Sequence, residues 1–563
     1  MIPDGGRTSP WRWAIVLAAG VMLSLRFGFN FGIGNHNTYL LHALRRVHPE
    51  LLSADWLASF TQDYHPVFTH FAALLLRLDE SGWLFALMNV LCITLSAVLV
   101  YLILRELVSA RLALPVFLLT AAFMGVGATY SVSGSYLFSA TFQPSTVAVM
   151  GCLLAMLWFV RERTLASGLC LAVAGAFHAN FAVLVVPWFG LSHLLLGWKG
   201  CGRRLVLQLA PVGATLALLS PLLLGQAGSP HAEAARTIFQ QVLAPQHYVP
   251  SSYWTEFVVY FAWCALGWMA GRSVLFGAGN RRPGALWLSS LLLVSIATLL
   301  TTVVFIPTVS QLYFWRLAPF TVLLSQIAAG AGLLTLLDDA TTSAPGKRRP
   351  LLFVAGVISI WLLFRYHYGE FRFLQYGLLI ALAAVLALRP WLAVRLGPRI
   401  RVASWSAWNV WIVAAAFPLV SLSARSSLLH GLPQHEAELY EWAATTPQES
   451  VFLIPPQLEN FRLNARRAVV ADLKSTPVEP GQLLEWYRRI GLICGQDSVR
   501  SVISAAAGYA TLDSSRLATI AAQLPIDYVV VAGSQPFTGT TEWQLAIESS
   551  GFRAYVRARD PLR

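Results

Sequence analysis

Charged residues are scarce in this chain, and their scarcity decides its class. Only 12% of the 563 residues are Asp, Glu, Lys or Arg, whereas 56% are hydrophobic and 20 are Trp. Soluble globular domains carry about 25% charged residues. The composition therefore excludes an ordinary soluble globule and predicts a multi-pass α-helical membrane protein.

Signals of several other protein classes are missing as well. Of the six cysteines only Cys494 lies in the polar C-terminal region, so no disulfide framework is predicted. No cleavage pattern stands apart from the first apolar run, which predicts a retained helix over residues 13–29 rather than a removed signal peptide. No GxGxxG pattern follows a predicted strand, and no basic segment with interleaved aromatic residues predicts a nucleic-acid partner.

Long apolar runs are what the chain has in abundance. A spanning helix needs roughly 20 mostly apolar residues, and thirteen runs come close to this length. The predicted spans are 13–29, 83–104, 112–130, 139–160, 164–177, 181–197, 205–225, 253–271, 285–306, 316–337, 351–366, 373–389 and 405–424. We therefore expect a membrane domain over residues 1–424.

The basic residues give this domain an orientation. Lys and Arg gather in alternate connections, among them Arg161, Arg163 and residues 199–204. Such connections face the cytoplasm, so we expect a protein of the cytoplasmic (inner) membrane with a cytoplasmic N-terminus and residues 425–563 outside. The formal charge of +13 then reflects topology and contact with anionic membrane lipids.

The first extracytoplasmic connection, residues 30–82, is unusually long and rich in polar residues. Its start predicts a helix lying in the membrane interface, and "PVFTHFAALLLRL" predicts a second juxtamembrane helix. One face of the first helix carries Asn35, Thr38, Tyr39 and His42, and the other carries Leu40, Leu41, Leu44 and Val47. Asn35, Tyr39 and His42 suit hydrogen bonds to sugar hydroxyls, while the leucines would anchor the helix in lipid. In the alternative interpretation the polar face meets only water and headgroups.

This organisation resembles the GT-C class of membrane glycosyltransferases, which use sugars linked to polyprenyl phosphate. The features shared are the first span, the long loop with two juxtamembrane helices, about a dozen spans and an outer C-terminal domain. The segments "NHNTYL", "DWLASFTQDYHPVFTHF", "FHAN" and "PPQLENFRLNARRAVVADLKSTP" more narrowly resemble an uncharacterised bacterial family of such proteins. The resemblance implies a GT-C-like fold, a polyprenyl-phosphate-linked sugar donor and a glycan or lipid acceptor.

The loop departs from the GT-C pattern in its acidic residues. An acid usually follows the first span closely, and Asn35, His36 and Asn37 stand there instead. The base that deprotonates the acceptor hydroxyl would then be a carboxylate, Asp55 or Asp63, or an imidazole, His36 or His65. Both aspartates also suit helix or turn caps. Asp63, His65 and His36 match no tight metal-ligand spacing, so no metal site is predicted from these residues.

The departing polyprenyl phosphate needs a cation, either a basic side chain or a divalent metal ion. Arg26, Arg316 and Arg372 lie near outer ends of predicted spans. Arg26 could bind a ligand or could extend its side chain to the interface. His178 and Asn180 in "FHAN" could line a site, or could satisfy backbone groups at that tight turn.

Residues 425–563 alternate predicted helices with short Val- and Ile-rich strands, so we expect a small extracytoplasmic α/β domain. Its Arg462 and Arg466 could face the membrane and hold an anionic headgroup or donor phosphate, or could be ordinary surface charges. Two further function classes stay open beside a glycosyltransferase: a transporter or lipid-handling protein without transfer chemistry, and a non-catalytic scaffold for envelope assembly. The middle of nearly every predicted span is uncharged, and no repeat is evident, which disfavours transport.

Overall fold

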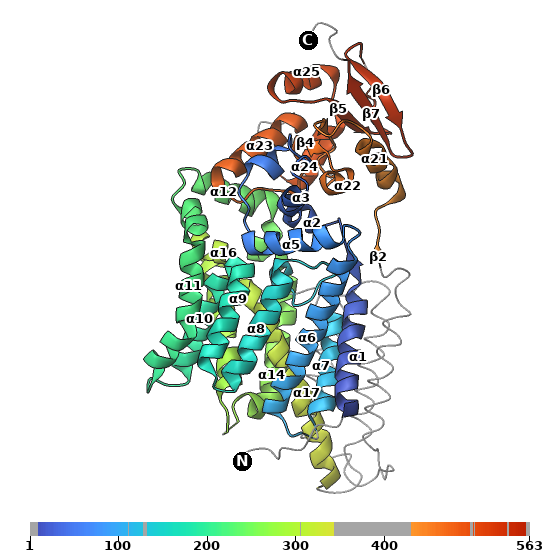
Figure 1. Cartoon of the computed structure of the whole chain (residues 1–563). Helices are drawn as coiled ribbons and strands as arrows, with labels where there is room; N and C mark the ends of the chain where they lie inside the picture. Colours follow the sequence, from blue (N-terminus) through green and yellow to red (C-terminus); the bar gives the residue numbers. More distant parts are fainter. Residues whose placement is uncertain are drawn as a thin grey trace.

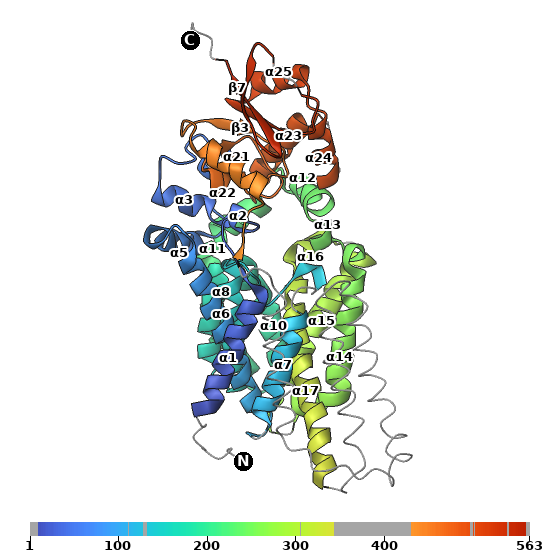
Figure 2. The same ribbon diagram turned by 90° about the vertical axis from the view of Figure 1, so that its right-hand side faces the viewer.

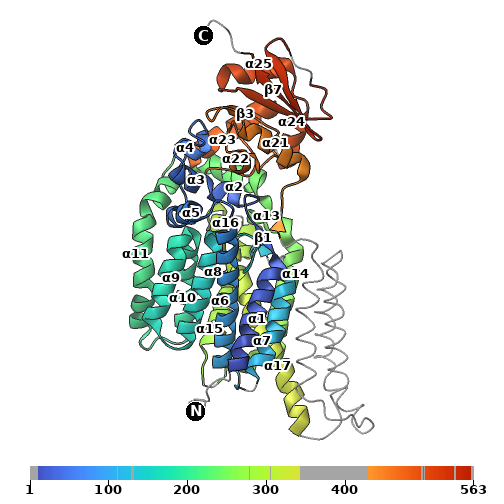
Figure 3. The same cartoon turned by 45° about the vertical axis from the view of Figure 1, so that its right-hand side comes forward.

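The computed structural model describes residues 10–110, 112–127, 132–277, 279–304, 306–342, 429–495, 499, 501–537 and 540–558. A bundle of parallel and antiparallel helices carries the C-terminal α/β domain at one end, which we call the domain end (Figure 1). The short helices of the first loop lie between the bundle and this domain in all three views (Figures 1, 2 and 3).

Helices occupy all ten predicted spans that fall within the described residues. They are α1 (Pro10–Phe27), α6 (Trp83–Leu107), α7 (Ala113–Gly127), α8 (Pro144–Val160), α9 (Thr164–Phe177), α10 (Ala179–Leu195), α11 (Cys201–Ala227), α14 (Trp254–Leu275), α15 (Arg282–Thr302) and α17 (Ala318–Thr342). Among the described residues, five helical segments are long and apolar enough to cross a membrane, and α8, α9 and α10 are shorter apolar helices. The predicted spans 351–366, 373–389 and 405–424 lie outside the described residues, so the count of thirteen stays a prediction.

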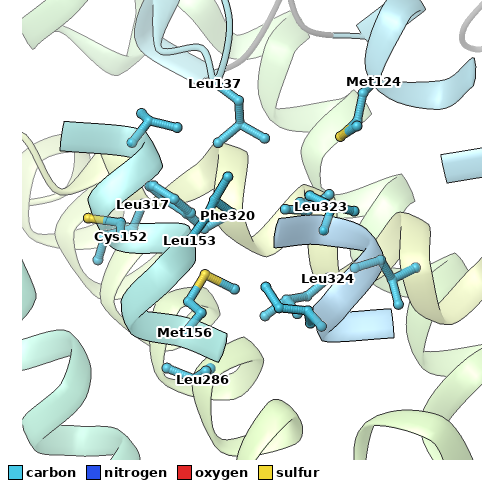
Figure 4. Packing of buried hydrophobic residues seen from close by; sticks show 14 of the residues in the cluster. Met124, Leu137, Cys152, Leu153, Met156, Leu286, Leu317, Phe320, Leu323 and Leu324 are labelled. Carbon is cyan, nitrogen blue, oxygen red and sulfur yellow. The ribbon is translucent and has the colours of Figure 1, made fainter. Parts of the chain in front are cut away.

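The bundle has a continuous apolar core to which most of its helices contribute. Met156 of α8, Leu286 of α15 and Leu324 of α17 are completely or almost completely buried in it (Figure 4). Helices α14 and α17 approach so closely that only glycine fits at two positions between them. A Cβ atom at Gly271 would lie 2.2 Å from the backbone oxygen of Ala328, and one at Gly332 would lie 2.0 Å from that of Ala270. Small residues allow such close packing between membrane helices, whose association gains little from the hydrophobic effect.

The first loop folds into four short helices in place of the two expected. These are α2 (His36–Tyr39), α3 (Leu41–Val47), α4 (Trp56–Phe60) and α5 (Pro66–Leu78). Leu40, Leu41 and Leu44 are at most 2% exposed and pack with α5 in a core of their own. The expectation that these leucines anchor a helix in lipid was therefore wrong. An apolar helix face needs an apolar neighbour, and here protein supplies it.

Further short elements cover the domain end of the bundle. Near residue 133 the chain forms η1 (Val132–Gly134), and between α11 and α14 it forms a second group of short helices. That group consists of α12 (Ala232–Thr237), η2 (Ile238–Leu243), α13 (Pro245–Tyr248) and η3 (Pro250–Tyr253). Between α15 and α17 lie α16 (Pro307–Leu312) and η4 (Phe314–Leu317). Helix α12 packs against the C-terminal domain (Figure 2).

The C-terminal domain is a mixed five-stranded sheet with helices, as the sequence predicted. Its helices are α21 (Gln434–Ala444), α22 (Phe461–Ala465), α23 (Pro480–Cys494), α24 (Val502–Ala510) and α25 (Ser514–Gln523). Its strands are β3 (Val451–Leu453), β4 (Ala468–Val469), β5 (Tyr528–Ala532), β6 (Trp543–Glu548) and β7 (Phe552–Arg557). They are ordered β4-β3-β5-β7-β6; β3 pairs in parallel with β4 and β5, and β7 is antiparallel to its neighbours.

The first loop and the C-terminal domain form one interface. Strand β1 (Phe29–Asn30) pairs in parallel with β2 (Leu429–His430). Deeper in the interface Asp55 accepts a hydrogen bond of 2.7 Å from Nε of Arg462, whose NH1 also pairs with Asp472. All three side chains are at most 1% exposed. This buried ion triad joins residues more than 400 positions apart in the sequence.

Loss of the guanidinium from this triad should destabilise the protein strongly. Removal of one partner from a buried ion pair costs about 3–5 kcal/mol because the remaining charge stays buried. Arg466 offers a matched control, since it also bridges the interface, to Glu80 at 2.6 Å, but is about 39% exposed. We expect Arg462→Met to lower the free energy of unfolding in detergent by several kcal/mol, and Arg466→Met by less than about 1 kcal/mol. Equal losses would contradict the importance of the triad.

Candidate functional site

An arginine without an ion-pair partner among the described residues stands at the domain end of the bundle. Arg316, in η4, is half-buried, and its NH1 donates a hydrogen bond of 2.8 Å to Nε2 of His178. Its guanidinium lies over the ring of Tyr313, 4.9 Å from the centroid, and 5.9 Å from that of Phe181. Within the described residues no carboxylate lies within ion-pairing distance of it.

Aromatic and imidazole rings from the first loop extend this contact. The His178 ring, between α9 and α10, lies 4.8 Å from that of His65. The His65 ring in turn lies 5.2 Å from Tyr39 and 4.7 Å from Tyr64. The first loop thus brings two tyrosines and a histidine to the turn between α9 and α10, where His178 bonds to Arg316.

The other side of the group comes from α13. The Tyr248 and His247 rings lie 5.3 Å and 5.8 Å from Tyr313, and Nδ1 of His247 lies 2.7 Å from the Ser133 carbonyl oxygen. Tyr313 has a φ of 61°, a left-handed conformation that costs an L-residue roughly 1 kcal/mol. We call this set the Arg316 cluster: Tyr39, Tyr64, His65, His178, His247, Tyr248, Tyr313 and Arg316.

The cluster holds its histidines and tyrosines neutral. Burial, and secondly the charge of Arg316, lowers the pKa of His65 to about 3. Burial raises the pKa of Tyr39 and of Tyr248 to about 12, against the opposing effect of Arg316. Arg316 therefore stands as a cation among uncharged hydrogen-bonding groups, which makes the cluster attractive to an anion.

Several polar atoms here have no protein partner. The hydroxyls of Tyr39, Tyr64 and Tyr248 bond to no other residue in the described part of the chain. Nε of Arg316 and Nδ1 of His178 are buried without a partner there. Buried polar groups are normally satisfied, so atoms of this kind are places where a ligand can bind.

The two aspartates proposed as bases occupy structural positions. Asp55 caps α4 through Ala58 N at 2.8 Å, and its other oxygen accepts from Arg462 and from Val469 N. Asp63 accepts from His65 N and Thr69 before α5 and pairs with Arg46 at 3.3 Å. Every carboxylate oxygen is already bonded, so the contacts favour the capping alternative, extended in Asp55 by the buried triad.

Among the polar residues predicted on the first loop helix, Tyr39 is the one whose ring contacts a cluster member, His65, and Asn35 and His36 have other partners. His36 is fully buried, with Nε2 2.9 Å from the Phe142 carbonyl oxygen and Nδ1 accepting from Gly32 N. Asn35 donates to Gln143 at 2.8 Å. The pKa of His42 is lowered by burial, against the nearby charge of Asp63. His36 is thus a neutral structural bridge, and Tyr39 is the residue of this helix that reaches the cluster.

The other predicted ligands are dispersed. Asn180 donates to the Leu312 carbonyl oxygen at 3.0 Å, next to the cluster, and Arg26 lies half-buried in the last turn of α1. Arg462 and Arg466 are in the ion pairs described above, so neither points a free cation toward the membrane. Arg372 lies outside the described residues. Across the described residues, no group of three or more His, Cys, Asp or Glu side chains could hold a metal ion.

Some members of the cluster were not predicted from the sequence. Tyr64 adjoins the predicted His65, and Tyr313 stands three residues before the predicted Arg316, so their neighbours in sequence were a signal. His247 and Tyr248 lie in the second long outer connection, residues 226–252, whose length was the only hint.

Comparisons with known proteins give a general likeness. Residues 434–493 match a family described as a domain of unknown function, DUF6798. No curated protein matches the chain significantly. The oligosaccharyltransferase of Archaeoglobus fulgidus in the apo form is 11% identical over 93% of this chain and 69% of its own, with a TM-score of 0.46.

A second solved protein is similar over nearly its whole length. ArnT from Cupriavidus metallidurans is 14% identical in the apo state over 97% of this chain and 98% of its own, with a TM-score of 0.46. Bound to undecaprenyl phosphate it is 12% identical over 98% and 99%, with a TM-score of 0.43. Both proteins are GT-C glycosyltransferases, the class that the sequence resembles.

The buried histidine bridge predicts acid sensitivity. Burial lowers the pKa of His36 to about 4. In the unfolded chain this histidine is protonated as the pH falls below about 6.5, whereas in the folded protein it stays neutral until the pH approaches 4. The stability from neutral His36 is complete above pH 6.5 and is lost as the pH falls toward 4, on the order of 1 kcal/mol by pH 5.5. We expect His36→Gln to weaken the loss of thermal stability between pH 7.5 and 5.5. The control His435→Gln, at an exposed histidine, should lose as much thermal stability over this pH range as the parent protein. The same loss in His36→Gln as in the parent protein would contradict the assignment.

Proposed function

We propose that the protein is a glycosyltransferase of GT-C type that takes a sugar from a lipid-phosphate carrier and transfers it to a cell-envelope acceptor at the outer face of the cytoplasmic membrane. The observation that carries this proposal is Arg316, a half-buried guanidinium without a carboxylate partner among the described residues, surrounded by neutral tyrosines and histidines. A cation in such a setting is stabilised when an anionic ligand binds.

A phosphate ester matches this setting. Guanidinium groups bind phosphate oxygens through charge-assisted hydrogen bonds, and Nε of Arg316 has no protein acceptor in the described chain. Phosphate is also the group on which charge develops when the bond to the sugar breaks, so the same arginine would stabilise the departing carrier. The free hydroxyls of Tyr39, Tyr64 and Tyr248 suit the hydroxyls of the sugar.

The position of the cluster suits a substrate with a lipid tail and a polar head. Helix α16, which ends just before the η4 helix that holds Arg316, lies at the end of the bundle that faces the loop helices (Figure 3). A polyprenyl chain there could stay beside the apolar helices while its phosphate and sugar lie between the bundle and the domain. Membrane lipids, the lipid-linked sugar and a glycan or lipid acceptor are accordingly the proposed partners.

Removal of the Arg316 charge should weaken binding of a polyprenyl phosphate. Hydrogen bonds to charged groups contribute about 1.5–3 kcal/mol, equivalent to roughly a 10- to 100-fold change in Kd. We expect Arg316→Gln to raise the Kd for undecaprenyl phosphate by at least 10-fold, measured on the purified protein in detergent. Binding of neutral undecaprenol should not change.

Arg161 provides the matched control for this measurement. It lies at the opposite end of the bundle, directly after α8, and pairs with Glu106 at 2.9 Å. Arg161→Gln should leave the Kd for undecaprenyl phosphate unchanged. Equal affinity in the parent protein and Arg316→Gln would overturn the phosphate site. Specific binding without sugar transfer from any lipid-linked donor would favour the lipid-handling alternative.

The proposed orientation can be tested with two exposed positions. Ile503 of α24 and Trp198 between α10 and α11 are 81% and 82% exposed. Helix α24 and the connection from α10 to α11 lie at opposite ends of the molecule (Figure 1). Native cysteines are buried or half-buried, so they give a low background. A membrane-impermeant maleimide added to bacterial spheroplasts should label Ile503→Cys, and should label Trp198→Cys only after permeabilisation. The opposite pattern would place the cluster on the cytoplasmic side.

A further inference from the structure

A half-buried carboxylate of the C-terminal domain, Glu459, stands beside Asn460, which bonds to α2, the helix that carries Tyr39 of the Arg316 cluster. Glu459 makes no hydrogen bond or ion pair with any described residue. Asp55 and Asp63 of the first loop, by contrast, have their oxygens occupied. Glu459 is therefore an acid with unused acceptor capacity in a part of the interface where acids are otherwise bonded.

The position of Glu459 is set by contacts between its neighbours and α2. The next residue, Asn460, accepts a hydrogen bond of 2.7 Å from Asn37. The Ser475 hydroxyl donates to the Asn37 carbonyl oxygen at 2.9 Å, and Thr38 donates to the Lys474 carbonyl oxygen. The residue after Thr38 is Tyr39, a member of the cluster. The segments that carry Glu459 and Lys474 are thus seated directly on the helix that delivers Tyr39.

Lys474 connects Glu459 to the cluster electrostatically. Burial lowers the pKa of His247, a cluster member, and the charges of Arg316 and Lys474 lower it further. The charge of Lys474 also opposes the rise in the pKa of Glu459, whose main cause is burial. Lys474 itself forms no ion pair within the described residues. The charge of Lys474 therefore acts on both the Glu459 carboxylate and His247 of the Arg316 cluster.

Resting on the function proposed above, we propose that Glu459 is the general base of the transfer reaction, supplied by the C-terminal domain rather than by the first loop. In the step, the acceptor hydroxyl oxygen forms the new bond to the anomeric carbon. The bond from that carbon to the phosphate oxygen breaks, and its electron pair leaves with the phosphate beside Arg316. The hydroxyl proton passes to the Glu459 carboxylate.

This assignment gives the C-terminal domain a chemical role. A base must be a free acceptor within reach of the acceptor hydroxyl, and its carboxylate works best when its pKa is raised toward the working pH. Glu459 is a free acceptor and is partly desolvated. The acceptor sugar or lipid would enter between α2 and the segment 456–460, opposite the phosphate side of the cluster.

The test compares donor binding and transfer in the same variants. We expect Glu459→Gln to leave the Kd for undecaprenyl phosphate unchanged and to lower sugar transfer from a lipid-linked donor pool at least 100-fold. Glu441→Gln, an exposed glutamate of the same domain without a partner among the described residues, should transfer at the parent rate. Transfer by Glu459→Gln at the parent rate would overturn the inference. No transfer by the parent protein from any donor, with phosphate binding intact, would instead overturn the proposed function.

The pH profile separates a base from a residue that only supports the fold. Parent activity should rise with pH through the titration of Glu459 and then level off. Because the charge of Lys474 lowers the pKa of Glu459, Lys474→Met should move this rise to higher pH, and Glu459→Asp should retain part of the activity with a shifted profile. A parent profile and a Lys474→Met profile that coincide would contradict the inference.

Discussion

The buried contact of Asp55, Arg462 and Asp472 is the interaction on which the arrangement of the domain end depends. Two carboxylates and one guanidinium lie out of water, so each needs the others to offset its desolvation. Asp55 also caps α4 and accepts from Val469 of β4. A single side chain of the first loop therefore fixes a loop helix, a strand of the C-terminal sheet and the arginine between them.

The consequences of this contact extend to the proposed site. Asp472 uses its second oxygen to accept from the backbone of Lys474 and Ser475, and its carbonyl accepts from Trp486. Ser475 in turn bonds to α2, the helix of Tyr39. The triad thus sets where the Lys474 segment rests on α2, and α2 sets where Tyr39 meets His65. Precise placement of a site by bonded neighbours is what a reaction needs, because small displacements of reacting groups lower the rate steeply.

The sequence predicted the helices well because their apolar runs are long. The α/β character of the C-terminal domain was also anticipated from its short Val- and Ile-rich segments. Strand β6 was not among them, because it contains no Val and a single Ile and its residues after Trp543 are largely exposed. Leu40 and Leu41 were assigned to lipid because a hydrophobic pattern specifies an apolar neighbour without saying whether it is lipid or protein. For the site, Arg316, His65, His178 and Tyr39 were named in advance as separate candidates. That they form one cluster depends on tertiary structure, because it is produced by turns between helices that are far apart in the chain.

Two arginines of the C-terminal domain, Arg462 and Arg466, were expected to hold a headgroup or phosphate, but they pair with carboxylates of the protein. Arg462 and Arg466 lie in a basic stretch that, in sequence, resembles a binding site for an anion. The anion that each meets is a carboxylate of the first loop, Asp55 for Arg462 and Glu80 for Arg466. These two arginines therefore hold the first loop, whereas Arg316 in the bundle has no carboxylate partner in the described chain. The C-terminal domain in turn carries Glu459, which makes no hydrogen bond or ion pair among the described residues, on a segment bonded to α2. In the proposed reaction Arg316 would meet the phosphate, and Glu459 would meet the acceptor hydroxyl.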